Sequence, residues 1–249
     1  MKEGGNQMNI YQKQPAEIAS IFVGKPKVIG QQNADHPMER EWKTSIFKEP
    51  FDGQIFLGMT NLEGDEQADL KHHGGPEKAV FSYPSEHYHY WQNKLGNSEI
   101  KPGGMGENFS TINLQESDVA IGDIYEVGEA VIQVSQPRQP CWKPARRFQI
   151  QNLAILLQNS GRTGWYYRVL QEGFVEAGQS VQLRDRVAPE WTIEKCNQVM
   201  HIERENFEKA AALAAVSELA TNWKKTLLNR IEMRKAEDIH NRVFGPNVE

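Results

Sequence analysis

The sequence is poor in cysteine and lacks long apolar runs, and each absence excludes a class of protein. Two cysteines, Cys141 and Cys196, occur among 249 residues, which is too few for a disulfide framework or a cysteine-rich zinc site. A reducing compartment suits such a chain better than a secreted setting. The longest near-apolar run, Ala210–Val216, is far shorter than a membrane-spanning helix. With no apolar core of a signal peptide at its start, the sequence predicts a cytoplasmic protein without a membrane partner.

The chain also lacks a basic excess. Its net charge is −5, whereas dedicated nucleic-acid binders are usually basic. From Glu190 onward, nine cations stand against ten anions, so the C-terminal part presents no basic face by count. We therefore expect no nucleic-acid partner, and we assign this part to packing or to docking of a protein partner.

Short apolar stretches separated by turn residues predict a mainly β fold. Strand patterns occur at Ile18–Val23 and Ala79–Tyr83. A hairpin is expected where Gly128-Glu129 separates Val119–Val127 from Ala130–Ser135. So many short strands favour a closed or nearly closed sheet.

Helical spacing predicts peripheral helices at Ser85–Lys94 and Ile150–Leu157 and, after a change of composition at Pro189, three more helices. Thr192 and Ser217 are candidate N-caps of the C-terminal helices. The expected organisation is a loose extension at 1–17, a β-barrel domain at 18–188, a three-helix module at 189–240 and a tail at 241–249.

The segment Ser135–Phe148, S-Q-P-R-Q-P-C-W-K-P-A-R-R-F, places Cys141 among prolines and cations. Prolines fix the backbone and withhold N–H donors, so we expect a stiff loop rather than a helix or an inner strand. Neighbouring cations favour the thiolate, which attacks electrophiles and binds soft metals. From the residues alone, a nucleophile, a metal ligand and an inert buried thiol all stay open. Cys196 has no such neighbours and is assigned to packing. The cations are Arg138, Lys143, Arg146 and Arg147.

Two glycine-rich segments upstream are candidate walls of a ligand site. His73-Gly74-Gly75-Pro76 would place backbone N–H groups and an imidazole at a tight turn, which suits an anionic ligand. Gly103–Ser110, G-G-M-G-E-N-F-S, offers close backbone approach but lacks the Lys-Ser/Thr end of a P-loop. Spacing alone favours an ordinary turn or loop for each segment.

Taken together, these segments resemble the MOSC domain family and, more narrowly, the YiiM-type 6-hydroxylaminopurine resistance proteins. The resemblance runs from about residue 18 to about residue 240 and implies a MOSC-type β-barrel with peripheral helices, followed by a small three-helix module. The matching stretches are L-E-G-D-E-Q-A-D (62–69), H-G-G-P-E-K-A-V (73–80), Y-P-S-E-H-Y-x-Y-W (83–91), G-E-N-F-S (106–110), I-G-D-I-Y (121–125), I-Q-V-S-Q-P-R-Q-P-C (132–141), G-W-Y-Y-R-V (164–169) and L-A-T-N-W-K-K-T-L-L-N-R (219–230).

The resemblance implies that Cys141 is the protein ligand of a molybdenum cofactor, a molybdenum pyranopterin. Because that cofactor carries a phosphate, it needs cationic and backbone N–H contacts as well as partners for the pterin edge. His72 stands where an apolar residue is typical, so the separate roles of His72 and His73 stay open. The implied cofactor contacts are His73, Gly74, Lys78, Gly106, Glu107, Asn108, Ser110 and Arg138.

The implied activity is an oxidoreductase that reduces N-hydroxylated bases or amines, such as 6-hydroxylaminopurine, for detoxification. The sequence shows no flavin, iron–sulfur or NAD motif, so electrons are expected from a separate reductase, and a homodimer stays open. The alternative is a sulfur-carrier or cofactor-delivery domain without turnover of its own. A cysteine hydrolase or transferase, with Cys141 paired to a histidine, is a further alternative.

Overall fold

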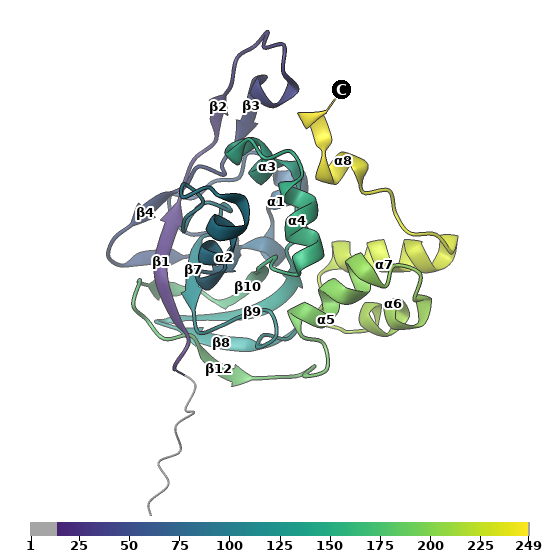
Figure 1. Cartoon of the computed structure of the whole chain (residues 1–249). Coiled ribbons are helices and arrows are strands. Elements are labelled where there is room, and N and C mark those ends of the chain that lie inside the picture. Colours follow the sequence, from purple (N-terminus) through teal and green to yellow (C-terminus); the bar gives the residue numbers. More distant parts are fainter. Residues whose placement is uncertain (1–13, 249) are drawn as a thin grey trace, which may run out of the picture.

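The computed structural model describes residues 14–248 (Figure 1). The expected extension at 1–17 therefore lies mostly outside the described residues, and its last residue, Glu17, already begins a strand. Eight strands form one sheet in the order β12-β8-β9-β10-β6-β7-β1-β4, in which the only parallel pair is β6 with β7. The strands are β1 Glu17–Val23, β4 Glu49–Phe51, β6 Val80–Pro84, β7 Phe109–Ile112, β8 Ile124–Val127, β9 Ala130–Pro137, β10 Trp165–Gln171 and β12 Gln182–Asp185.

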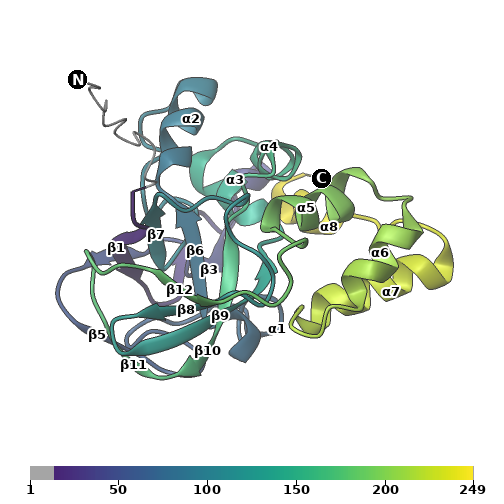
Figure 2. The same ribbon diagram turned by 90° about the horizontal axis from the view of Figure 1, so that it is seen from below.

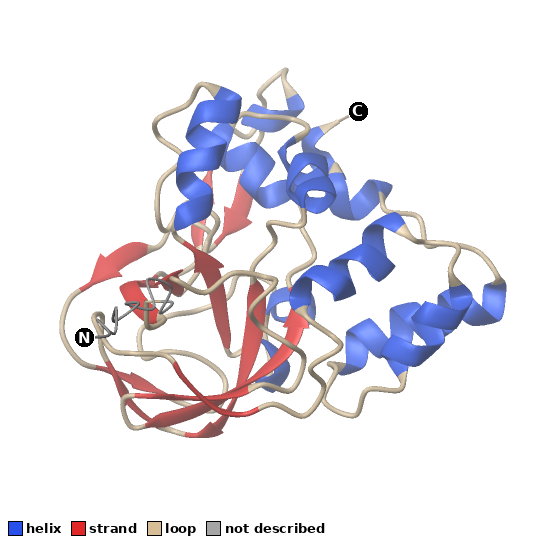
Figure 3. Cartoon of the chain, turned by 60° about the horizontal axis from the view of Figure 1, so that its bottom comes forward, coloured by secondary structure: helices blue, strands red, loops and turns tan. Residues whose placement is uncertain are grey.

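The sheet curls into a half-barrel, with helices along its upper and right-hand sides in Figure 3. The predicted mainly β fold with a curled sheet is thus confirmed, as is the hairpin of β8 and β9. Two separate two-stranded ribbons accompany this sheet: β2 Lys27–Ile29 with β3 Trp42–Thr44, and β5 Ile55–Leu57 with β11 Gly173–Val175.

Alternation along the strands separates two hydrophobic clusters. Trp165 and Tyr167 on β10 and Ile132 on β9 are fully buried inside the curl, as expected for side chains two residues apart. On the other face of β6, Phe81 and Tyr83 pack in a second cluster with the helices. Those helices are α2 Glu86–Leu95, α3 Trp142–Phe148 and α4 Leu153–Ser160.

The Cys141 segment differs from the predicted loop. Strand β9 continues through Pro137 in the middle of the sheet, and helix α3 begins directly after Cys141. Pro144 is the third residue of α3, where its missing N–H leaves no hydrogen bond unmade. The expectation of a loop throughout was therefore wrong, because proline is tolerated in a first helical turn.

The C-terminal part forms the expected group of helices (Figure 2). Helix α5 (Ile193–Asn197) runs into a π-helical turn at Gln198–Ile202, and α6 (Phe207–Ala214) and α7 (Thr221–Met233) follow. Thr192 caps α5, accepting a hydrogen bond from the Lys195 N–H at 3.2 Å, as predicted. Ser217 caps no helix, because α7 starts four residues later, after Ala220.

The final segment returns to the barrel. Helix α8 (His240–Val243) leads into a 3₁₀ turn at Gly245–Asn247, and this turn packs against α3. Val243 and Asn247 are buried. None of the helices within residues 14–248 is long and apolar enough to cross a membrane.

Candidate functional site

Cys141 lines a pocket at which segments far apart in the sequence meet. A backbone hydrogen bond from the Asn108 N–H to the Phe81 carbonyl, at 2.8 Å, brings the glycine-rich loop beside β6. The short helix α1 (Leu70–His73) and the 3₁₀ turn at Pro76–Lys78 place a second loop opposite. Six of the nine sequence-predicted residues line this pocket: His73, Lys78, Gly106, Asn108, Arg138 and Cys141.

Gly74, Glu107 and Ser110 do not line the pocket. Gly74 lies at a tight turn, where a Cβ would meet the Leu70 side chain at 3.0 Å. Ser110 is buried on β7. The Glu107 side chain folds back within the glycine-rich loop and accepts hydrogen bonds from the Tyr88 hydroxyl at 2.6 Å and from the Gly103 N–H at 2.7 Å. These bonds support the conformation of the loop. Burial raises the pKa of Glu107 despite these donors.

Asn108 is saturated by protein groups although it lines the pocket. Its side-chain oxygen accepts from the Phe81 N–H at 3.1 Å. Its amide nitrogen donates to the Phe22 carbonyl at 3.2 Å and to Asp65 at 3.0 Å. This residue therefore fixes the positions of Phe81 and Asp65 more than it offers free hydrogen-bonding capacity.

A buried ion pair on the pocket wall, Lys48 with Asp65, was missed by the sequence analysis. Their side chains are 7% and 0% exposed, and Asp65 also accepts from the Gly24 N–H at 2.9 Å. Burial lowers the pKa of Lys48, and the neighbouring Asp65 opposes that shift. Asp65 belongs to the quoted stretch 62–69, but nothing in the sequence marks Lys48.

Cations outnumber anions around the pocket. Lys48, Lys78, Arg138 and Lys143 line it together with Asp65 and Glu66. Burial, reinforced by Lys143, Arg138 and Lys78, lowers the pKa of His73 to about 3. The His73 imidazole is therefore neutral at physiological pH, and the positive charge of the pocket comes from its lysines and Arg138. His72, by contrast, is exposed and pairs with Asp69 at 2.9 Å.

Arg138 is the residue best prepared for an anionic ligand. It is 5% exposed, and its guanidinium lies 5.1 Å from the centre of the Phe81 ring. Its Nη1 atom is buried without a hydrogen-bond partner among residues 14–248. Because a buried charged donor left unpaired is costly, an anion in this pocket would complete its hydrogen bonding. The donor set thus fits a phosphate-bearing cofactor.

The other two cations of the Cys141 segment have structural roles. Arg146 is buried and donates to Asn247 at 2.8 Å and to the Pro37 carbonyl at 2.8 Å. Arg147 donates to the Gly103 carbonyl at 2.8 Å and packs on Phe47. Neither lines the Cys141 pocket. Of the four cations that the sequence places around the thiol, only Arg138 and Lys143 line this pocket.

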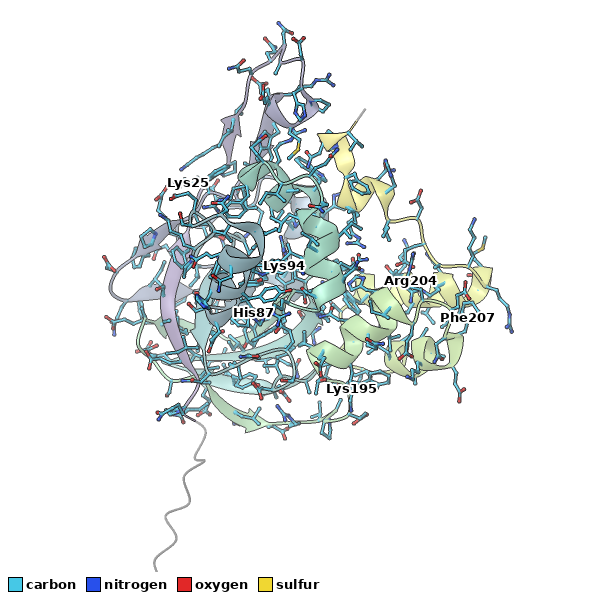
Figure 4. The ribbon with its side chains drawn as sticks, viewed as in Figure 1. Lys25, His87, Lys94, Lys195, Arg204 and Phe207 are labelled. Carbon is cyan, nitrogen blue, oxygen red and sulfur yellow. The ribbon has the colours of Figure 1, made fainter. Side chains whose placement is uncertain are left out.

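One buried histidine outside this pocket, His87, has a structural role. His87, labelled in Figure 4, is buried and contacts Glu116 at 2.7 Å, and Glu116 in turn accepts from the Gly164 N–H at 2.9 Å. Within residues 14–248, no group of three His, Cys, Asp or Glu side chains is placed to hold a metal ion.

The curled sheet, the thiol in a cationic pocket and the appended helices define a β domain of a known architecture with a helical C-terminal module. The MOSC domain matches residues 69–182, and the YiiM-like, 3-alpha helix domain matches residues 191–234. The chain belongs to the MOSC domain family, in its YiiM-like branch.

Relatives match over most of the chain. Protein YiiM of Escherichia coli is 40% identical over 205 residues, which cover 81% of this chain and 91% of that protein. The crystal structure of YiiM from Geobacillus stearothermophilus superposes with a TM-score of 0.73 at 35% identity, covering 87% of this chain and all of that one. A Gibberella moniliformis protein named "Reductase" is 36% identical over 192 residues, and the match covers 74% of this chain but 34% of that protein.

Proposed function

We propose that this protein is an oxidoreductase that holds a molybdenum cofactor through Cys141 and reduces N-hydroxylated bases or amines. Membership of the MOSC family and the reductase-named relative support an oxidoreductase. The observation that supports the cofactor assignment is the Nη1 atom of Arg138, which is buried without a hydrogen-bond partner among the described residues, in the pocket that Cys141 lines. A thiolate is a soft donor, which suits molybdenum.

The residues of the pocket divide the work of holding such a group. Cys141 would supply the sulfur ligand, and Arg138, Lys78 and Lys143 would contact the phosphate. Gly106 has φ +83°, and a Cβ there would lie 2.9 Å from Ile46. Only glycine therefore lets the backbone at this position pack so closely against Ile46 in the pocket wall. His73, kept neutral by burial and by its cationic neighbours, would donate or accept a hydrogen bond at the pterin edge.

The reaction is balanced by two electrons and two protons: R–NHOH + 2e⁻ + 2H⁺ gives R–NH₂ + H₂O. When bound, the cofactor supplies the two-electron chemistry, and the protein supplies the shaped site. A separate reductase would deliver the electrons to this chain in the cytoplasm.

The alternative of a sulfur carrier is less compatible with the position of the thiol. Cys141 is 7% exposed, whereas a carrier has to present its sulfur to another protein. Burial favours a permanent ligand.

Conversion of 6-hydroxylaminopurine to adenine with an artificial electron donor tests the activity. The protein should be produced in a host that makes the cofactor. The wild type and a Cys196→Ala control, whose cysteine is buried in the core and is not part of the pocket lining, should turn over, while Cys141→Ala should lose turnover. Full activity of Cys141→Ala would remove the thiol from the mechanism.

A further inference from the structure

A second cavity adjoins the Cys141 pocket on the side of the C-terminal helices. The two share His73, Lys78, Cys141, Lys143 and Tyr166. Cys141 therefore belongs to a wall shared by a cationic pocket among the barrel loops and a cavity whose far side is lined by residues of α7 and α8.

The far side of this cavity is fixed to the barrel. Arg242 on α8 donates to the Pro140 carbonyl, next to Cys141, and to Gln158 of α4 at 2.7 Å. Asn247 donates to the Trp142 carbonyl at 3.0 Å. Two exposed side chains, Asn222 on α7 and Asn241 on α8, then line the cavity. The helices thus act as a lining of the site.

The chemistry of this cavity differs from that of the cationic pocket. Gln136, Gln139, Asn222 and Asn241 contribute neutral amides. The lining includes two carboxylates, Asp69 and Asp238, and three cations, Lys78, Lys143 and Arg242. Opposite charges in this cavity therefore largely offset each other. Trp142 and Tyr166 contribute aromatic surface. Amides and flat rings together recognise an uncharged planar molecule with N–H donors and ring-nitrogen acceptors.

Gln136 is a specific anchor in this cavity for such a planar molecule. It is 2% exposed at the end of β9, and its Nε2 donates to the Pro137 carbonyl at 3.2 Å. Its Oε1 is buried without a partner within the described residues. A buried acceptor without a donor is costly, and an amino or N–H group of a ligand in the cavity would satisfy it.

We propose that this cavity seats the reducible substrate, and that Gln136, Asn222 and Asn241 select a planar nitrogen heterocycle over an aliphatic hydroxylamine. The inference rests on the proposed function for its reaction, but it assigns the C-terminal helices a part in substrate choice.

Equilibrium dialysis of the cofactor-loaded protein against labelled adenine, the amine product, tests the proposal without turnover. Gln136→Leu should raise the Kd about tenfold, because a neutral hydrogen bond is lost. Asn222→Ala and Asn241→Ala should each raise it about threefold, and their double variant about tenfold. Asn229→Ala is the matched control, an exposed asparagine of the same helix α7 outside the cavity lining, and it should bind adenine as the wild type does.

Both asparagines are exposed, so their variants report on binding even where Gln136→Leu fails to fold. Wild-type affinity in the Asn222→Ala/Asn241→Ala double variant, or no adenine binding by the wild type, overturns the proposal. Adenine binding that is lost in the double variant, in a protein that reduces no N-hydroxylated compound, would instead support the cavity and refute the proposed reaction.

Discussion

The carboxylate of Glu77 caps helix α7: both of its oxygens accept a hydrogen bond from the Thr221 N–H at 3.0 Å, and one accepts from the Thr221 hydroxyl at 3.2 Å. Glu77 lies in the loop that carries His73 and Lys78 into the site, and Thr221 is the first residue of α7. An acid at a helix N-terminus satisfies orphan N–H groups and complements the helix dipole. The loop that lines the Cys141 pocket and the C-terminal helices are thereby joined.

Glu77→Ala should lower the free energy of unfolding by about 1–2 kcal/mol through loss of this cap. It should also reduce cofactor retention, because the loop loses its attachment. Thermal unfolding and metal content measure the two effects. Glu232→Ala, an exposed acid near the other end of α7, is the control. Equal melting temperatures for the two variants would contradict a capping role.

The Lys48–Asp65 pair should be strongly coupled. Lys48→Met leaves a buried carboxylate without its cation, which costs about 3–5 kcal/mol. The double variant Lys48→Met/Asp65→Asn should recover part of that loss in urea unfolding. At the exposed Lys27–Glu49 pair, separated by 3.5 Å, Lys27→Met should change stability by less than about 1 kcal/mol. If Lys48→Met lowered the free energy of unfolding no more than Lys27→Met does, the buried pair would not be coupled as described.

Glu107 should make stability depend on pH. Burial raises its pKa above the ordinary 4.5, so the native state binds a proton more tightly than the unfolded state. Stability should therefore fall as pH rises from about 4.5 through the native pKa. Glu107→Gln removes the titration, so the difference in melting temperature between wild type and variant should shift in favour of the variant over that interval. Parallel melting curves across pH 4–7 would show that Glu107 does not contribute.

Arg138 should control anion binding before any metal is present. In cofactor-free protein, inorganic phosphate should raise the melting temperature, and Arg138→Met should lose most of that rise, because a charge-assisted contact disappears. Arg184→Met, at an exposed arginine of β12, should keep it. An unchanged phosphate effect in Arg138→Met would place the anion elsewhere.

Local patterns were sufficient for several strands and for part of the site. Short apolar stretches marked β1, β6 and β9, and the prolines and cations marked Cys141 and Arg138. Strand β7 begins at Phe109, inside the segment Gly103–Ser110 that was predicted as a loop. Arg146 and Arg147 were wrongly expected near the thiol because helix α3 was not predicted. This helix directs Arg146 to Asn247 and Arg147 to Gly103.

The remaining features of the site depend on contacts between segments far apart in the sequence. Lys48 pairs in the pocket wall with Asp65, which is 17 positions away, and the cap of α7 comes from a residue 144 positions earlier rather than from Ser217. Helix α8 closes the second cavity through Arg242 and Pro140. None of these pairs has a spacing that a single sequence reveals.

Molybdenum content tests the central claim most directly. Elemental analysis of protein from a cofactor-producing host should find about one molybdenum atom per chain in the wild type and in Cys196→Ala, and almost none in Cys141→Ala. Sulfane sulfur on Cys141 without stoichiometric molybdenum would instead support the carrier. A wild-type protein without molybdenum that still reduces 6-hydroxylaminopurine at full rate would contradict the account.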